Sequence, residues 1–446
     1  MTGATTMRHV LFAFTFALLG AGHTWAQGSP APEPENTTMQ PIKVEIVQSD
    51  GKYQLLRGGK PYVIRGAGID HSDLETFKAH GGNSLRTWAV DDGPIPAREL
   101  LDKAHALGLT VSLCLEFARE RHGFDYNDAA AVARQKEETR ARIIAHKDHP
   151  ALLTWIIGNE LNFDYDNPKV FDAVNDVSKM IHDIDPNHPT TTALAGADKR
   201  VMRDVQERAG DLDFLSFQLY ADVVNLPKYV KQSDYTGPYF VTEWGAVGHW
   251  EVFKTRWDAP VEQTSSEKAA TYANSYLKVI QEHGDQIIGS YVFLWGQKQE
   301  RTGTWYGMFT EDGSSTEAVD VMYYIWNNKW PDNRAPRVSR LAINGKVGYD
   351  NITLWRGKEY PAELNAVDSD NDALTYHWEV REESKAKEIG GDKEVIPPLI
   401  EGLISSESGP KISIKAPEKG GAYRLFVYVS DGNNNTGHSN TPFYVK

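Results

Sequence analysis

Two glutamates, each at the end of a short run of mainly apolar residues, are the side chains best placed to do chemistry. Glu160 follows the run 151–157, and Glu243 follows the run 239–242. Runs this short, bounded by turn residues, are typical of buried strands in a parallel sheet. Two carboxyl groups that face one site can act as a proton donor and a nucleophile or base, which is what glycoside hydrolysis requires.

The two glutamates are expected to differ in protonation. We predict that Glu160 is the acid/base, with a raised pKa that keeps its carboxyl group protonated at neutral pH. Glu243 is predicted to be the nucleophile, held in its ionised form by positive charge or hydrogen-bond donors nearby. The plain alternative for Glu160 is a surface acid at a strand end.

Three further polar residues lie close to these positions or to other strand ends. Asn159 precedes Glu160 and could donate a hydrogen bond to a sugar hydroxyl. Arg86, in the segment 83–88, is the expected cation beside Glu243, although an arginine at a strand end often forms only a structural ion pair. Tyr220, just past the segment 213–219, could donate its hydroxyl group to the Glu243 carboxylate.

Four tryptophans are candidates for contact with a sugar ring. Trp295 closes the segment 287–295 and is expected to form the floor under the ring. Trp88, Trp250 and Trp305 lie at or after strand ends, in segments that are predicted to be loops at one rim. Together they suggest an elongated cleft with several sugar subsites. A core position is the alternative for Trp295, and each of the other three is weak evidence when taken alone.

The elements that must position these residues alternate between strand and helix. Apolar segments of strand length occur at 61–66, 83–88, 109–116, 152–159, 189–194, 213–219, 238–244 and 287–295. Between them lie segments with a 3.6-residue period, such as 97–107 and 266–283. This order predicts an α/β fold, a (β/α)8 TIM barrel, whose catalytic groups lie at the carboxyl ends of the strands.

The rest of the chain divides into shorter parts. Residues 1–26 are expected to be a signal peptide, and residues 27–40, rich in proline and polar residues, a disordered linker. The barrel domain is expected over residues 41–330. It is expected to begin with a hairpin around Asp50-Gly51. Alternating apolar residues and frequent turns predict an immunoglobulin-like β-sandwich over 337–446.

Composition excludes several classes of partner and cofactor. The formal net charge of −14 argues against nucleic acid or an anionic membrane surface. No nucleotide-binding, zinc-protease or cysteine-cluster motif is present, so neither a cofactor nor a metal is expected in the site. Cys114, the only cysteine, should be a buried strand residue. The acidic run 368–372 could bind calcium, but a solvated turn is the favoured reading.

Several motifs resemble those of clan A retaining glycoside hydrolases. The matching segments are WIIGNE at 155–160 and TEWG at 242–245, together with HPAL at 149–152, DPNHP at 185–189 and GKPYVIRG at 59–66. The barrel is similar to family 2 catalytic domains, but the large domains that normally precede that barrel are missing. A barrel followed by one immunoglobulin-like domain, with 243 − 160 = 83 residues between the glutamates, is closer to family 158.

This resemblance implies a retaining β-glucan hydrolase, specifically an endo-β-1,3-glucanase acting on laminarin-type substrates. An exo-acting β-glycosidase or a transglycosylase of the same clan is the alternative among enzymes. A barrel that only binds polysaccharide, or a structural surface protein, is the alternative outside them. We expect a polysaccharide partner, a monomer, no membrane span, and a secreted or periplasmic location.

Overall fold

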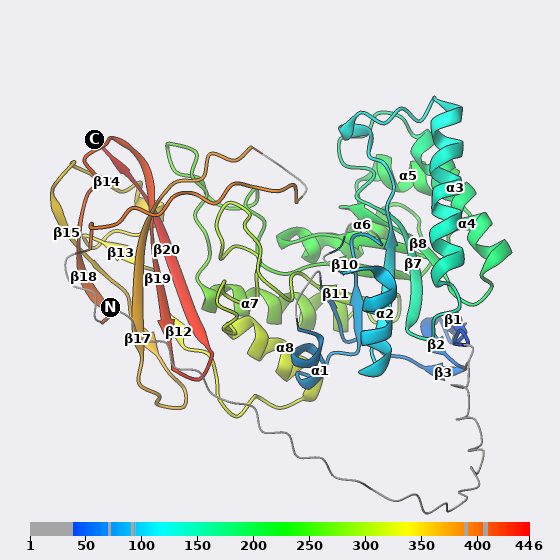
Figure 1. Cartoon of the computed structure of the whole chain (residues 1–446), viewed down its shortest axis with the longest axis horizontal. Coiled ribbons are helices and arrows are strands. Elements are labelled where there is room, and N and C mark those ends of the chain that lie inside the picture. The colour runs from blue at the N-terminus through cyan, green and yellow to red at the C-terminus, as the bar shows by residue number, and fades with distance from the viewer. Residues whose placement is uncertain (1–38, 70–72, 91–92, 94, 388–390, 405–408) are drawn as a thin grey trace, which may run out of the picture. The chain divides into compact units, whose positions relative to one another are not determined.

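The computed structural model describes residues 39–69, 73–90, 93, 95–387, 391–404 and 409–446 (Figure 1). The expected signal peptide over 1–26 and all but the last two residues of the expected linker lie outside this range. Residues 39–446 form one compact unit. None of the helices in the described ranges has both the length and the apolar character that crossing a bilayer requires.

Eight parallel strands in the described part of the chain close a barrel, with each strand beside the next in sequence. This confirms the predicted (β/α)8 barrel. The strands are β4 (Gly66–Gly68), β5 (Ser84–Arg86), β6 (Thr110–Leu115), β7 (Leu152–Asn159), β8 (Thr190–Ala195), β9 (Leu215–Gln218), β10 (Tyr239–Glu243) and β11 (Ile287–Val292).

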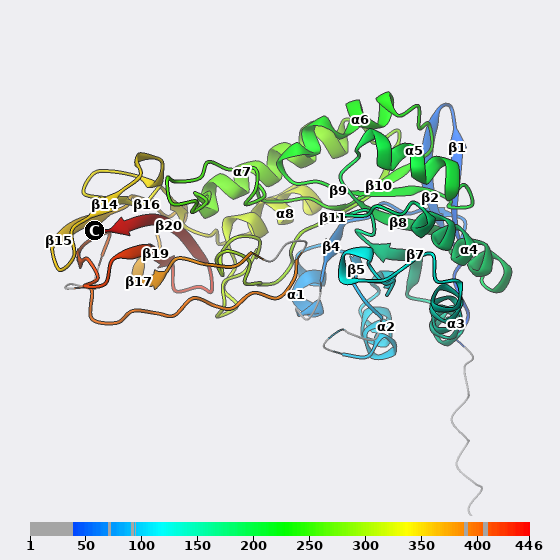
Figure 2. The same cartoon turned by 90° about the horizontal axis from the view of Figure 1, so that it is seen from above.

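One α-helix follows each barrel strand, and the helices surround the sheet (Figure 2). They are α1 (Leu74–Ala79), α2 (Ala97–Ala106), α3 (Ala129–His146), α4 (Lys169–Ile184), α5 (Lys199–Arg208), α6 (Leu226–Gln232), α7 (Ser265–Ser275) and α8 (Glu317–Asn327). The apolar faces of the helices and the outward side chains of the strands form the main hydrophobic core. Cys114 is buried on β6, as predicted.

Two predicted elements differ most from the structure. The first barrel strand begins only at Gly66, because Lys60–Pro61 (β3) pairs with the N-terminal hairpin instead. A Cβ on Gly66 would lie 2.6 Å from the Tyr291 ring, so this tightly packed strand requires glycine. The predicted helix 266–283 is α-helical to Ser275 and continues as a π-helical turn over Tyr276–Gln281.

The predicted hairpin, β1 (Val44–Ser49) and β2 (Lys52–Arg57), covers the end of the barrel at which the strands begin. Its Val44 and Leu55 side chains share a small core with Leu153, Phe240 and other residues of the barrel. The Val44 N–H also donates to the Asn187 carbonyl at 2.8 Å. Because this end is closed by apolar packing, the opposite rim is the one available for a site.

The C-terminal residues form antiparallel sheets with one parallel edge strand. Residues from the four-stranded and three-stranded sheets share a second hydrophobic core. The strands are β12 (Arg337–Val338), β13 (Ala342–Ile343), β14 (Thr353–Leu354), β15 (Glu359–Glu363), β16 (Ala366–Val367), β17 (Thr375–Glu382), β18 (Lys411–Lys415), β19 (Gly421–Ser430) and β20 (Thr436–Val445).

The acidic run 368–372 forms a hydrogen-bonded turn. Asp368 Oδ1 accepts the N–H groups of Asp370 and Asp372 at 2.8 and 2.9 Å. Asp368, Asp372 and the more distant Asp431 bring one carboxylate oxygen each to within 4.8 Å of one another. Asp431 in turn accepts two backbone N–H groups of its own loop. These bonds account for the turn geometry that the sequence suggested.

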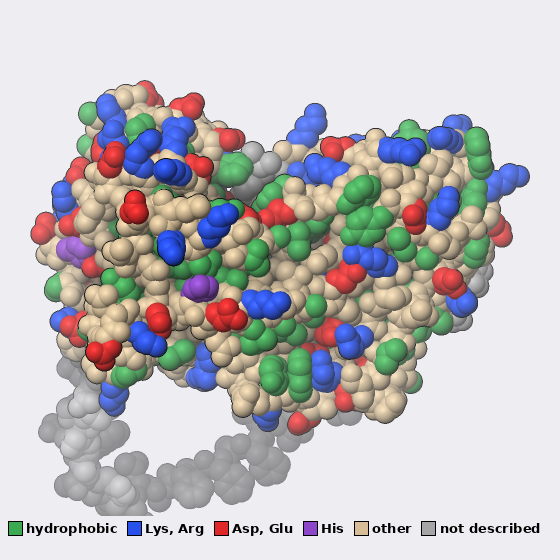
Figure 3. Space-filling model, turned by 180° about the vertical axis from the view of Figure 1, so that it is seen from behind, with side chains coloured by type: hydrophobic (Ala, Val, Ile, Leu, Met, Phe, Trp, Pro, Cys, Tyr) green, Lys and Arg blue, Asp and Glu red, His purple; other side chains and the backbone are tan. Residues whose placement is uncertain are grey.

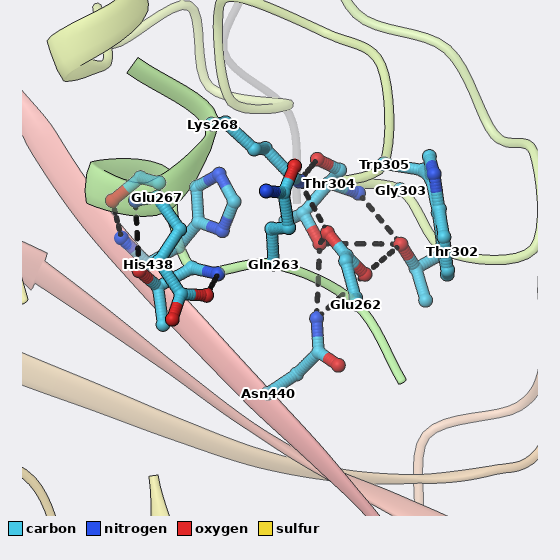
Figure 4. Close-up of polar contacts among 12 residues, drawn as sticks. Glu262, Gln263, Glu267, Lys268, Thr302, Gly303, Thr304, Trp305, His438 and Asn440 are labelled. Atoms are coloured by element: carbon cyan, nitrogen blue, oxygen red, sulfur yellow. Dashed lines mark hydrogen bonds and ion pairs between the residues drawn. The ribbon is translucent and has the colours of Figure 1, made fainter. Parts of the chain in front are cut away.

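A buried polar cluster joins the C-terminal sheets to the barrel (Figure 4). Lys268 on α7 donates to the carboxylate of Glu262, which also accepts from Thr302, Thr304 and Asn440 on β20. Burial alone would raise the pKa of Glu262, but the Lys268 charge and these hydrogen bonds outweigh it and lower the pKa to about 2. The carboxylate is therefore ionised and fully satisfied.

Replacing Lys268 by alanine is expected to lower the free energy of unfolding by about 3–5 kcal/mol, because it leaves the buried Glu262 carboxylate without its cation. Urea denaturation followed by tryptophan fluorescence measures this change. Lys278→Ala, at an exposed position just beyond the same helix, is the matched control and should change stability by less than about 0.5 kcal/mol. Equal effects of the two substitutions would contradict this account of the cluster.

Charged side chains of both signs are interspersed over the face of the molecule shown in Figure 3. Ion pairs elsewhere in the described structure, such as Arg208–Asp172 and Arg340–Glu267, also join opposite charges. A mixed surface of this kind does not create the broad positive field that attracts nucleic acid.

Candidate active site

Glu160 and Glu243 line one cavity at the carboxyl ends of the barrel strands. Glu243 is the last residue of β10, and Glu160 directly follows β7. The cavity has a volume of about 390 Å³, and Asn159, Tyr220, Trp88 and Trp250 also line it. A concave site of this size with convergent polar groups is typical of a small-molecule or substrate site. The structure thus brings together residues from distant parts of the chain.

Three donors hold the Glu243 carboxylate. Arg86 Nη1 and Trp88 Nε1 donate to Oε1 at 2.6 and 2.7 Å, and the Tyr220 hydroxyl donates to Oε2 at 2.9 Å. Arg86 is completely buried, so its charge is poorly screened by water. Charge-assisted bonds of this kind stabilise the carboxylate and fix its orientation. The predicted positions of Arg86 and Tyr220 beside Glu243 agree with this geometry.

Glu160 lies in a different environment. Burial, and then the negative charge of Glu243, raise the pKa of the Glu160 carboxyl to about 7, against the opposing charges of Arg119 and Arg86. At neutral pH a large fraction of Glu160 is therefore protonated. Its backbone has a φ of 52°, in the left-handed region that residues with a side chain seldom adopt. Such strain is concentrated at functional sites, where the surrounding structure maintains it.

Asn159 is held in one orientation by two donors. Its Oδ1 accepts from Arg86 Nη2 and from Gln218 Nε2, both at 2.7 Å. Among the described residues none accepts a hydrogen bond from the Asn159 amide nitrogen, so its N–H groups can donate to a ligand in the cavity. Arg86 therefore connects Glu243 with Asn159, the residue that directly precedes Glu160.

Two residues of this network were missed in the sequence. Gln218 lies two positions before Tyr220, and the two-residue alternation of a strand would have placed it on the same face. Arg119 lines the cavity and donates from Nε to the Asn159 carbonyl at 3.1 Å. It lies in the loop after β6, where no periodic pattern indicates which side chain points inward.

The four predicted tryptophans divide into two groups. Trp88 and Trp250 line the cavity, and Trp250 is 55% exposed. Trp295 is 1% exposed and packs against Phe77, Phe309 and Trp326 in the main core. It therefore does not form the expected floor of the cavity.

Trp305 is also 1% exposed, and its Nε1 donates to the Val247 carbonyl at 2.9 Å. It does not line the cavity, so the expected contact with substrate is not supported. Phe293 and Leu294, just before Trp295, line the cavity instead. The sequence placed the rim of the barrel correctly here, but it did not show which of these neighbouring side chains points inward.

No protein-family model and no curated protein matches this sequence. Solved structures of similar fold include the Bifidobacterium dentium β-glucuronidase, with 18% identity, a TM-score of 0.49, and coverage of 65% of this chain and 50% of that one. A glycoside hydrolase family 5 mannosidase from Rhizomucor miehei has 14% identity, a TM-score of 0.46, and coverage of 65% and 97%. Saccharomyces cerevisiae Gas2p, in complex with laminaritetraose and laminaripentaose, has 15% identity, a TM-score of 0.45, and coverage of 66% and 69%.

This chain also matches 57% of the length of a putative β-galactosidase from Bacteroides fragilis. It therefore spans only 50–57% of the length of two of these larger proteins.

Proposed function

We propose that this protein is a retaining glycoside hydrolase, with Glu243 as the nucleophile and Glu160 as the acid/base. The observation that supports this most directly is the contrast between two carboxyl groups in one cavity. Three donors hold Glu243, while burial and a neighbouring charge raise the pKa of Glu160. Environments that differ in this way assign the two roles of a double-displacement mechanism.

In the first step Glu243 attacks the anomeric carbon while Glu160 donates its proton to the leaving oxygen. A covalent glycosyl–enzyme forms, and the aglycone departs. In the second step ionised Glu160 removes a proton from water, which displaces Glu243 and returns it as a carboxylate. The product keeps the anomeric configuration of the substrate. This mechanism requires the two carboxyl groups to be ~5–5.5 Å apart.

The neighbouring residues have positioning and binding roles in this proposal. Arg86 and Tyr220 stabilise the charge of Glu243 before attack and after the intermediate breaks down. The Asn159 amide group donates to the hydroxyl beside the reacting carbon, a contact that strengthens in the transition state. Trp250, exposed at the rim, offers an aromatic face to an adjoining sugar unit.

We propose β-glucan as the substrate, cleaved within the chain at β-1,3 linkages. The motifs at 155–160 and 242–245 resemble those of clan A retaining glycoside hydrolases. The barrel followed by one C-terminal β-domain, and the spacing of 243 − 160 = 83 residues between the glutamates, resemble glycoside hydrolase family 158. In the same proposal residues 337–446 are an immunoglobulin-like domain. We also propose that residues 1–26 direct secretion to the periplasm or beyond. Cleavage of the chain before Gln27 in the secreted protein would test this proposal.

Digestion of β-1,3-, β-1,4- and mixed-linkage glucans, with sizing of the products, tests the substrate. Proton NMR of the first product formed tests retention of configuration. Oligosaccharides of several lengths from a β-1,3-glucan support endo action, whereas a single small product supports the exo-acting alternative. The absence of turnover on every glucan and aryl β-glycoside would favour a polysaccharide-binding barrel instead.

Tyr220→Phe is expected to lower kcat about 10- to 100-fold, because without this hydroxyl group the Glu243 carboxylate loses a contact that orients it for attack. The melting temperature and KM should change little. Steady-state kinetics on an aryl β-glycoside measure the effect. Tyr165→Phe is the matched control, because it removes a buried tyrosine–carboxylate bond, to Asp204, outside the cavity. A kcat equal to that of the wild type in Tyr220→Phe would contradict the role of this hydroxyl group.

A further inference from the structure

The connection between β17 and β18 leaves the C-terminal sheets and returns to the mouth of the barrel (Figure 1 and Figure 2). Two of its described residues, Gly391 and Asp392, line the cavity that contains Glu160 and Glu243. These residues are more than 140 positions beyond Glu243, so no pattern around the glutamates indicates their presence. The cavity is thus built from the barrel and from the C-terminal part of the chain.

Asp392 is anchored to the loop that follows β6. Arg121 Nη1 and Nη2 contact Asp392 Oδ2 and Oδ1 at 3.0 and 3.4 Å, and His122 Nε2 lies 3.7 Å from Oδ2. The Arg121 side chain is only 7% exposed, and its guanidinium group lies over the Phe163 ring. A two-pronged pair with a nearly buried arginine has a defined geometry, unlike an ordinary surface ion pair.

A second anchor lies on the loop that follows β11. The Arg301 N–H donates to Glu394 Oε2 at 2.7 Å, and the Glu394 side chain is almost completely buried. A Cβ on Gly391, whose φ is 79°, would lie 3.0 Å from Lys298 Nζ on the same loop. Segment 391–394 is therefore fixed at both ends, between the loops of the third and the eighth barrel strands.

The Asp392 side chain is still 36% exposed, so it can accept hydrogen bonds from a ligand. We infer that segment 391–394 is a wall of the substrate cavity, and that Asp392 binds a hydroxyl group of a sugar unit beyond the one that reacts. Asp392 is then a specificity-determining residue supplied by the C-terminal sheets. The wall limits how many sugar units can bind on its side of the glutamate pair.

This inference rests on the proposed function, but it differs from a purely structural role for the segment. A structural support would affect every substrate equally, because it would act through the stability of the rim. A wall that contacts a distant sugar unit affects only substrates long enough to reach it. The dependence of KM on substrate length therefore separates the two roles.

The test compares Asp392→Ala with Lys393→Ala, an exposed neighbour in the same segment. Kinetics are measured on an aryl β-monoglycoside and on β-1,3-linked gluco-oligosaccharides of increasing length. Asp392→Ala should leave kcat/KM for the monoglycoside within about twofold of the wild type. It should raise KM about tenfold for the longer substrates and change the sizes of their products, while Lys393→Ala should change neither.

Calorimetric binding of the same oligosaccharides in a Glu243→Ala background does not require turnover. Weaker binding of long oligosaccharides on addition of Asp392→Ala supports the wall even if the hydrolase proposal fails. Equal affinities of Glu243→Ala and of the Glu243→Ala, Asp392→Ala double variant for the long oligosaccharides would overturn the inference. The absence of detectable binding of any oligosaccharide to either variant would also overturn it. A uniform loss for all substrates, including the monoglycoside, would overturn it in favour of a structural role. If the wild-type protein binds these sugars but does not cleave them, the hydrolase proposal alone fails.

Discussion

Glu243→Ala is expected to lower kcat roughly 10⁴- to 10⁶-fold, the scale of loss seen when a covalent nucleophile is removed. The substitution removes the group that attacks the anomeric carbon and leaves Arg86, Trp88 and Tyr220 around an empty space. Steady-state kinetics on an activated aryl β-glycoside measure the loss. Glu282→Ala, at an exposed position on the barrel surface, is the control and should retain wild-type activity.

Azide should restore turnover in Glu243→Ala, because the small anion fits where the carboxylate was. The product should be a glycosyl azide of inverted anomeric configuration, identified by NMR, since only one displacement then occurs. Full activity of Glu243→Ala without azide would remove this residue from the mechanism. A glycosyl azide of retained configuration would also contradict the assignment of Glu243 as the nucleophile, because retention would require another residue to form the covalent intermediate.

Glu160→Gln is expected to lower kcat about 10²- to 10⁴-fold on substrates with poor leaving groups, the usual contribution of general acid catalysis. Substrates whose leaving group needs no protonation should form the glycosyl–enzyme at a nearly normal rate and then accumulate it. A burst of released phenol in stopped-flow absorbance would show that accumulation. Asp222→Asn, outside the cavity, is a control that replaces another carboxylate by an amide and should leave the burst absent.

The pH profile provides a second measurement on Glu160. Because burial and the Glu243 charge raise the pKa of Glu160 to about 7, the proton needed for donation is present below that pH and is lost above it. Wild-type kcat/KM should therefore fall as pH rises through about 7, and Glu160→Gln should lose this limb. A wild-type profile that stays flat well above pH 7 would contradict the proposed acid.

Periodic pattern predicted the barrel well, because each strand is buried on both faces and each helix on one. The run at 152–159, for example, coincides with β7. The polar residues that terminate such strands were also recognisable, which is why Glu160, Glu243 and Asn159 could be placed at one rim. The start of the first barrel strand was placed too early, because Lys60–Pro61 pair with the N-terminal hairpin, a contact that the apolar pattern of 61–66 does not reveal.

The parts of the site that were missed depend on side-chain direction and on distant contacts. Trp295 lies at the correct rim but points into the core, whereas Phe293, two residues earlier, lines the cavity. Arg119 and Asp392 lie in irregular segments, where neither a two-residue nor a 3.6-residue period predicts orientation. Composition and pattern identify buried strands, but they do not report which loop of another part of the chain packs against the rim.

The position of segment 391–394 in the chain has a consequence for biosynthesis. The chain is synthesised from its N-terminus to its C-terminus, so the barrel strands and Arg121 leave the ribosome well before Asp392. A nascent chain that ends before Gly391 therefore carries both glutamates beside an open rim. The cavity is completed only after residues 391–394 have been synthesised and have made their contacts with Arg121 and Arg301.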